Sequence, residues 1–77
     1  MNYNQLEELA LKAWRRDNGA YLRKALCQGC VLIKASITAP EDALAFEQVW
    51  EHWAKMLKRD RCVVCGEMKE TMMWPAN

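Results

Sequence analysis

Two pairs of cysteines constrain the fold of this chain more than any other feature of its sequence. Each pair has the spacing Cys-X-X-Cys, and 31 residues separate Cys27 and Cys30 from Cys62 and Cys65. The short spacing lets both sulfurs of a pair reach one ion from a tight turn, and four thiolates around one ion form a common structural zinc site. We therefore predict that the four cysteines bind one zinc ion, which joins two distant parts of the chain.

Disulfides, an iron site, a redox-active pair and free thiols are the alternatives to zinc. The N-terminus lacks the uninterrupted apolar run of a secretory signal, and no apolar stretch of about 18 residues could span a bilayer. We therefore expect a cytoplasmic protein with no membrane contact, in which thiols stay reduced and disulfides are rare. A thioredoxin-like pair would need a βαβ setting, for which the chain is too short. The spacing favours zinc but does not by itself separate zinc from iron.

The length of 77 residues predicts a single domain over 1–77 with a small apolar core. Domains of this size typically gain only about 3–5 kcal/mol of net stability from the core alone, so an additional staple is expected. A structural zinc ion contributes about 10–16 kcal/mol in small peptides at neutral pH. We therefore expect removal of the metal to unfold the domain.

Hydrophobic periodicity predicts a mainly α fold of three to four helices around the zinc. Asn4 is the expected N-cap of a first helix, which Asp17-Asn18-Gly19 should end. A short second helix or a helical turn is expected over 20–26. A capping box that starts at Thr38 precedes a stretch without Gly or Pro and predicts a long helix over about 39–60.

Two segments carry weaker signals. Residues 31–37 alternate as a short strand does, yet the same run suits two buried helical turns. Residues 67–77 show no clear periodicity, and we expect a C-terminal tail there that is free to be mobile. Gly29 and Gly66 are expected to supply the positive φ angles that tight turns around the cysteines need.

The aromatic residues divide into core candidates and one candidate for partner contact. Trp14, Trp50 and Trp53 fall on apolar helix faces, so we expect them in the core. Trp74 lies in the tail and either folds back over the core or contacts a partner. The single histidine, His52, lies beside the apolar stripe of the long helix, and we expect it at the surface rather than on the metal.

Basic residues flank both cysteine pairs, and a shared metal would draw them toward one face. The candidates for partner contact are Arg15, Arg16, Arg23, Lys24, Lys58, Arg59 and Arg61. The alternative is a structural role, because cations near helix C-termini complement the helix dipole and cations near a four-thiolate zinc site stabilise its negative charge.

No phosphate-binding loop, HExxH or GxSxG motif is present, so we predict a non-enzyme with no small-molecule substrate. The formal net charge of +1 favours no polyanionic partner. Enrichment in Trp and Met favours a protein–protein interaction module that binds a larger protein or complex as a regulator or inhibitor. The alternative is a nucleic-acid-binding zinc domain that uses the basic face.

Overall fold

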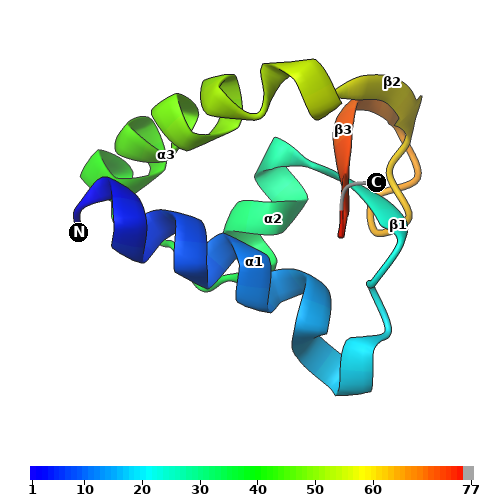
Figure 1. The fold of residues 1–77 in the computed structure, drawn as a ribbon, viewed down its shortest axis with the longest axis horizontal. Coiled ribbons are helices and arrows are strands. Elements are labelled where there is room, and N and C mark those ends of the chain that lie inside the picture. Colours follow the sequence, from blue (N-terminus) through cyan, green and yellow to red (C-terminus); the bar gives the residue numbers. More distant parts are fainter. Residues whose placement is uncertain (76–77) are drawn as a thin grey trace.

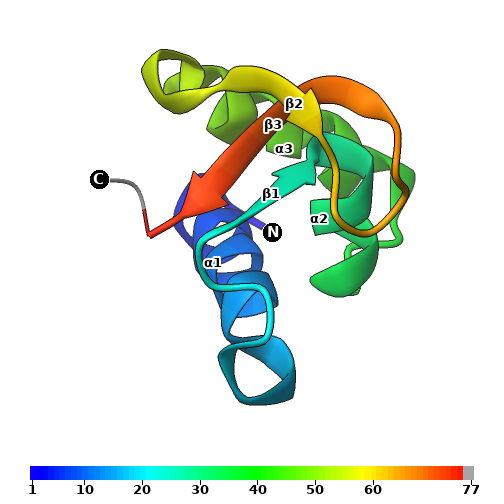
Figure 2. The ribbon, with the colours of Figure 1, turned by 90° about the vertical axis from the view of Figure 1, so that its right-hand side faces the viewer.

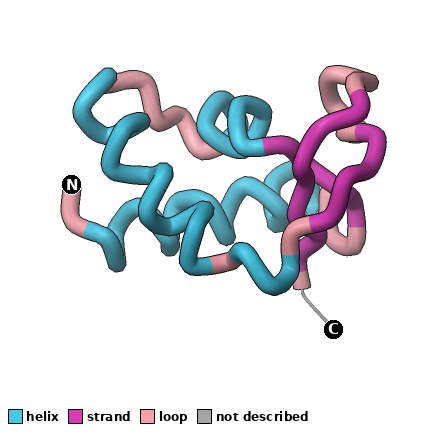
Figure 3. The backbone as a smooth tube through the Cα atoms, turned by 90° about the horizontal axis from the view of Figure 1, so that it is seen from above, coloured by secondary structure: helices cyan, strands magenta, loops and turns pink. Residues whose placement is uncertain are grey.

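The computed structural model describes residues 1–75, and within that range it contains three α-helices, one short 3-10 helix and three β-strands. The elements follow in the order α1 (Tyr3–Gly19), β1 (Lys24–Cys27), α2 (Gln28–Lys34), α3 (Pro40–His52), η1 (Ala54–Met56), β2 (Lys58–Arg61) and β3 (Met68–Trp74). The helices gather at one end of the molecule and the strands at the other (Figures 1 and 3). The fold is therefore mixed α/β, and the prediction of a mainly α domain is wrong.

The three strands form one antiparallel sheet in the order β1-β3-β2. β3 runs between the two shorter strands (Figure 2), with Leu26 of β1 opposite Met72 and Lys58 of β2 opposite Thr71. The stretch 67–77, for which the sequence predicts only a tail, thus supplies the central strand. The last part of that predicted tail, 76–77, lies outside the described residues.

The first helix is confirmed, but its cap lies two residues earlier than expected. The Asn2 side chain accepts a hydrogen bond from the Gln5 backbone, and the Gln5 side chain accepts one from the Asn2 backbone N–H, which together form a capping box. Asn4 lies inside the helix. At the other end Asp17 and Asn18 adopt left-handed backbone angles, which these residue types tolerate, and the helical run stops there as predicted.

Over 20–26, where a helix or a helical turn is predicted, no helix forms. The structure has a turn there, with Arg23 at a φ of +60°, followed by β1. Lys24 to Leu26 are good helix formers, but Leu26 becomes fully buried when it pairs with Met72. A contact 46 residues away along the chain therefore outweighs local propensity. The ambiguous stretch 31–37 lies mostly in α2, so its helical interpretation is confirmed.

The long predicted helix is confirmed only from Pro40 to His52. Pro40 occupies the first helical position, but the N-cap is Ala39, which makes no side-chain cap bond, so the capping box expected from Thr38 does not form. After His52 the chain tightens into η1 and then extends as β2. The prediction of helix to residue 60 is wrong because β2 pairs with β3. No pattern in the neighbouring residues predicts that pairing.

Aromatic side chains fill the core between α1 and α3, as predicted for Trp14, Trp50 and Trp53. All three are buried with Phe46, and neighbouring ring centroids lie 6.0–6.3 Å apart. Each buried indole N–H has an acceptor, as buried tryptophans require. The acceptors are the Lys24 carbonyl oxygen for Trp14, the Glu70 carboxylate for Trp50 and the Glu7 carboxylate for Trp53.

Candidate metal centre

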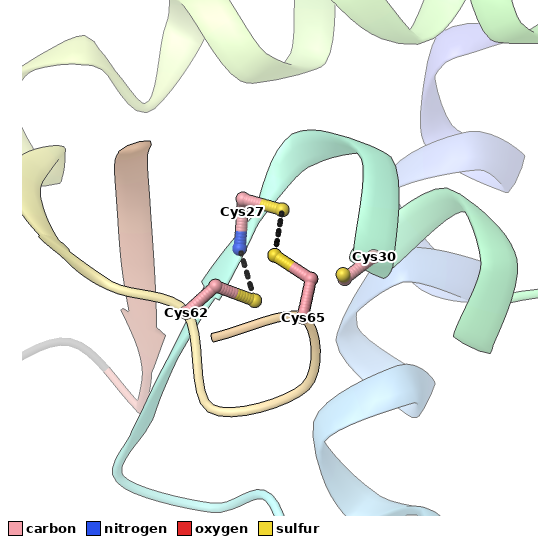
Figure 4. A group of neighbouring side chains, drawn as sticks. All are labelled: Cys27, Cys30, Cys62 and Cys65. Carbon is pink, nitrogen blue, oxygen red and sulfur yellow. Dashed lines mark hydrogen bonds between the residues drawn. The ribbon is translucent and has the colours of Figure 1, made fainter. Parts of the chain in front are cut away.

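The sulfur atoms of the four cysteines converge on one point between α2 and the sheet (Figure 4). All four are free thiols, and their Sγ atoms lie within 4.8 Å of one another. The Sγ atoms of Cys27 and Cys65 are 3.9 Å apart. A tetrahedral zinc ion with Zn–S bonds of about 2.3 Å holds its sulfurs about 3.8 Å apart. The cysteines are therefore positioned to ligate one metal ion.

The first cysteine pair lies where a strand turns into a helix. Cys27 ends β1 with an extended backbone and serves as the N-cap residue of α2, and Cys30 follows in the first helical turn. The change from extended to helical backbone brings both sulfurs to the same side. Gly29 is part of the helix and a Cβ added there would meet no atom within 4 Å, so the expected positive φ angle is not found at this glycine.

The second pair lies at the tip of the hairpin between β2 and β3. The Gly66 N–H donates to the Cys62 carbonyl oxygen at 2.8 Å, and the Cys62 N–H donates to the Glu67 carbonyl oxygen at 2.9 Å. Gly66 has a φ of +77°, as predicted, which a residue without a Cβ adopts at no steric cost. The Arg61 guanidinium donates to the Gly66 carbonyl oxygen. This tight turn presents Cys62 and Cys65 to the same point.

Two hydrogen bonds donated by backbone N–H groups also join the two pairs. The Cys27 N–H donates to the Cys62 sulfur, with a nitrogen–sulfur distance of 3.4 Å. The Val63 N–H donates to the Ala25 carbonyl oxygen at 3.0 Å. The hairpin tip is thus attached to the end of β1, which brings the two halves of the metal site into register.

The buried sulfurs differ in their affinity for protons. Burial by itself raises the pKa of Cys62, but three backbone N–H groups donate to its sulfur and lower the pKa to about 6. The donors belong to Cys65, Cys27 and Val64. Burial raises the pKa of both Cys27 and Cys30. The backbone donors therefore favour the thiolate at Cys62, whereas burial disfavours the thiolate at Cys27 and Cys30.

The basic residues predicted for partner contact fall in three places rather than on one face. Arg15 and Arg16 lie at the C-terminal end of α1, and Figures 1 and 2 show this end far from β2. Arg16 donates to the Lys34 carbonyl oxygen. The other candidates are Arg23 in the turn before β1, Lys24 at the start of β1, and Lys58, Arg59 and Arg61 on β2. The four cysteines therefore converge without bringing all of these cations together.

Trp74 and His52 occupy positions that limit their possible roles. Trp74 lies in β3, half-buried, and packs against the core, so only part of its ring is available to a partner. His52 is exposed at the end of α3, as expected, and its ring meets the Tyr3 ring edge to face at 5.8 Å. Neither residue is one of the four that converge on the metal site.

A pocket on the outer face of the sheet is a feature that the sequence did not predict. Its lining residues are Ala25, Lys55, Met56, Lys58, Asp60, Thr71, Met73 and Pro75. They come from β1, η1, β2, β3 and the residue after it, so only the sheet pairing brings them together. The one available signal was the run Thr71-Met72-Met73-Trp74, whose Thr and Trp favour strands.

Comparison of this chain with known protein families, with curated proteins and with solved structures finds no match in any of the three. Across residues 1–75, no helix is both long enough and apolar enough to cross a membrane. Inferences about function therefore depend on the residues of the chain itself.

Proposed function

We propose that this chain is a small, non-enzymatic zinc-binding module of the cytoplasm that acts by binding a larger protein. The observation that carries this proposal is the convergence of four cysteine sulfurs within 4.8 Å. Four thiolates complete a tetrahedral zinc site and leave no position for water or substrate. In this proposal the metal stabilises the fold, and the surface around it binds the partner protein.

Zinc is the metal that this donor set favours. Four soft thiolates suit zinc and iron alike, but zinc is redox-inert and stable as a single ion in a closed structural site. In a reducing compartment the thiols remain available to the metal. Metal analysis of the protein purified without added metal should give one zinc per chain, and iron with visible absorbance would contradict the choice of zinc.

The exposed surface near the metal supports binding to a protein. Val63 and Val64 at the hairpin tip, with Met68 and Met73 on β3, are 40–49% exposed. Flexible methionines are common at protein-binding surfaces because they adapt to the partner's shape. Three of the four tryptophans are buried in the core, so on this side of the molecule these aliphatic side chains and the open part of Trp74 are available for contact, while the more exposed Ile33 and Leu44 lie on α2 and α3.

Affinity purification of the tagged, zinc-loaded protein from its native source tests the proposal. A protein partner should be recovered and retained at high salt, because apolar contacts are little affected by ionic strength. Nucleic acid bound through phosphates would be released steeply as salt rises. A double variant, Cys62→Ser with Cys65→Ser, should lose both zinc and partner. Recovery of nucleic acid alone would favour the alternative of a nucleic-acid-binding domain.

A further inference from the structure

The pocket on the outer face of the sheet has an apolar interior and a charged rim. It measures about 220 Å³. Ala25 and Thr71 are almost completely buried in it, at 8% and 2% exposure. Met56 and Met73 are 36% and 44% exposed, and with Pro75 they offer aliphatic surface to an incoming group. The Thr71 hydroxyl is already engaged, because it donates to the Lys58 carbonyl oxygen at 2.9 Å.

The pocket lies on the side of the sheet opposite the helices. Successive side chains of a strand point to alternate faces. Met72 and Leu26 face the core and are fully buried, and the Glu70 carboxylate accepts a hydrogen bond from buried Trp50. The residues between them along the strands, which include Met73, therefore point away from the helical core. Within residues 1–75, Met73 on this outer face is 44% exposed.

Cations without partners surround the pocket. The stretch 55–61 carries four basic residues and one acidic residue. Lys55 and Lys58, both at the pocket, form no ion pair within residues 1–75. Asp60 is the one carboxylate that lines the pocket, and it accepts a hydrogen bond from the Arg61 N–H. The charge at the rim is therefore complementary to an acidic partner.

The size and lining of the pocket indicate what can enter it. Sites for whole small molecules usually measure about 300–1,000 Å³, so this smaller pocket suits a single side chain. Single-stranded nucleic acids bind through aromatic platforms on which bases stack. The lining contains no aromatic residue. An apolar side chain of a protein therefore fits the aliphatic lining better than a nucleobase does.

We propose that this pocket binds one large apolar side chain from an acidic segment of the partner protein, while Lys55 and Lys58 pair with flanking carboxylates. This inference rests on the proposed function, because it names the surface and the partner chemistry of the protein-binding module. The apolar anchor supplies most of the binding energy, since Met56 and Met73 enclose it. The two lysines favour acidic segments over neutral ones.

Selection from a phage-displayed library of random 12-residue peptides against the zinc-loaded protein tests the proposal. Peptides should be enriched that carry one Leu, Met or Phe flanked by Asp or Glu. A selected peptide, fluorescently labelled, should bind about tenfold or more weakly to Met73→Glu and to Lys58→Glu. Leu44→Glu and Lys12→Glu are matched controls at exposed positions that do not line the pocket, and they should bind as the original protein does.

The other outcomes overturn the inference. One is the enrichment of basic rather than acidic peptides. Another is that the selection enriches no peptide beyond those enriched in a parallel selection on Met73→Glu. The third is that an oligothymidine strand, which itself binds through Lys58, displaces the selected peptide. Zinc content and circular dichroism confirm that each variant is folded. If Met73→Glu and Lys58→Glu still retain the native partner in affinity purification, the pocket is not the docking site and the protein-binding function stands. If affinity purification of the unmodified protein recovers no protein partner, the proposed function itself is contradicted.

Discussion

The helical half of this protein and its knuckle hairpin, residues 58–70, are stabilised by different interactions. The helical half, α1 and α3, encloses an aromatic core in which Trp14, Phe46 and Trp53 are buried. Within the knuckle hairpin only Cys62 is buried, and every other residue is exposed. Burial of apolar surface therefore accounts for the helical half. The hairpin has almost none, so we attribute its stability to strand pairing and the proposed metal.

Only a few contacts tie the hairpin to the rest of the molecule. Glu70 accepts the Trp50 indole N–H, and the tip is bonded to β1 through Cys62 and Val63. A hairpin with one buried side chain is marginal in water on its own. We therefore expect that the candidate metal site and the aromatic core can be perturbed separately, and that the surface proposed for docking depends on both.

Metal removal should have the largest effect, and it should unfold the hairpin before the rest of the domain. In excess chelator and reductant, hydrogen exchange at 58–70 should become as fast as in an unfolded chain, because Cys62 and Cys65 lose the metal that would link them to Cys27 and Cys30. Structural zinc contributes on the order of 10–16 kcal/mol in small peptides. This narrows the expectation from the sequence, which is that the whole domain unfolds: the residues of α3 lie in the aromatic core and should keep measurable protection at low temperature. Hydrogen exchange by mass spectrometry measures both regions at once.

Two outcomes would change this comparison in different ways. Unchanged protection of 58–70 without metal would contradict the metal staple altogether. Equal loss of protection in the hairpin and in α3 would show that the helical half does not stand without the metal, as expected if the 77-residue chain unfolds as one unit.

The next largest effect should come from the helical half. Phe46→Ala removes a fully buried ring and should lower the free energy of unfolding of the zinc-loaded protein by about 3–5 kcal/mol. Leu44→Ala is the matched control, because Leu44 lies on the same helix at 68% exposure, and it should change the free energy by less than about 0.5 kcal/mol. Urea denaturation followed by tryptophan fluorescence measures both. Similar losses for the two variants would contradict the assignment of the core.

The sequence predicts the first helix, the start of the long helix and the grouping of the four cysteines because each depends on a local pattern. The apolar face of the first helix and the aromatic face around Phe46 follow the 3.6-residue period, and the residues on them are buried. The four ligand candidates follow from Cys-X-X-Cys spacing, and their sulfurs converge. In each case the information lies within a few residues.

The sheet could not be predicted, because β1 pairs with a strand that is distant in the sequence. Lys24 to Leu26 and Lys58 to Arg61 are charged or helix-favouring stretches, yet both become strands because β3 lies between them. The hydrophobic alternation that marks a strand is absent from β2, which is exposed throughout. The pocket on the outer face of the sheet could not be predicted for the same reason, since the strand pairing that creates it is non-local.

The two glycines beside the cysteines offer a matched pair of smaller effects. Gly66→Ala places a Cβ at a φ of +77° and should cost about 1–2 kcal/mol and weaken zinc retention. Gly29→Ala should be neutral or slightly stabilising, because Gly29 is helical and has free space around it. Competition with a zinc chelator and thermal melting measure both quantities. A larger loss from Gly29→Ala than from Gly66→Ala would contradict the distinction between the two turns.

The smallest effect separates two candidate caps of the first helix and tests whether the halves are independent. Asn2→Ala removes the side-chain acceptor for the Gln5 N–H and should cost about 1 kcal/mol. Asn4→Ala should change stability by no more than a few tenths of a kcal/mol, because Asn4 is exposed within the helix and alanine is a better helix former. Neither change should alter zinc retention, since α1 contributes no ligand. Denaturation with zinc bound measures the free energy of unfolding, and chelator competition measures zinc retention. Weakened zinc retention in Asn2→Ala would show that the two halves are coupled more tightly than their contacts imply.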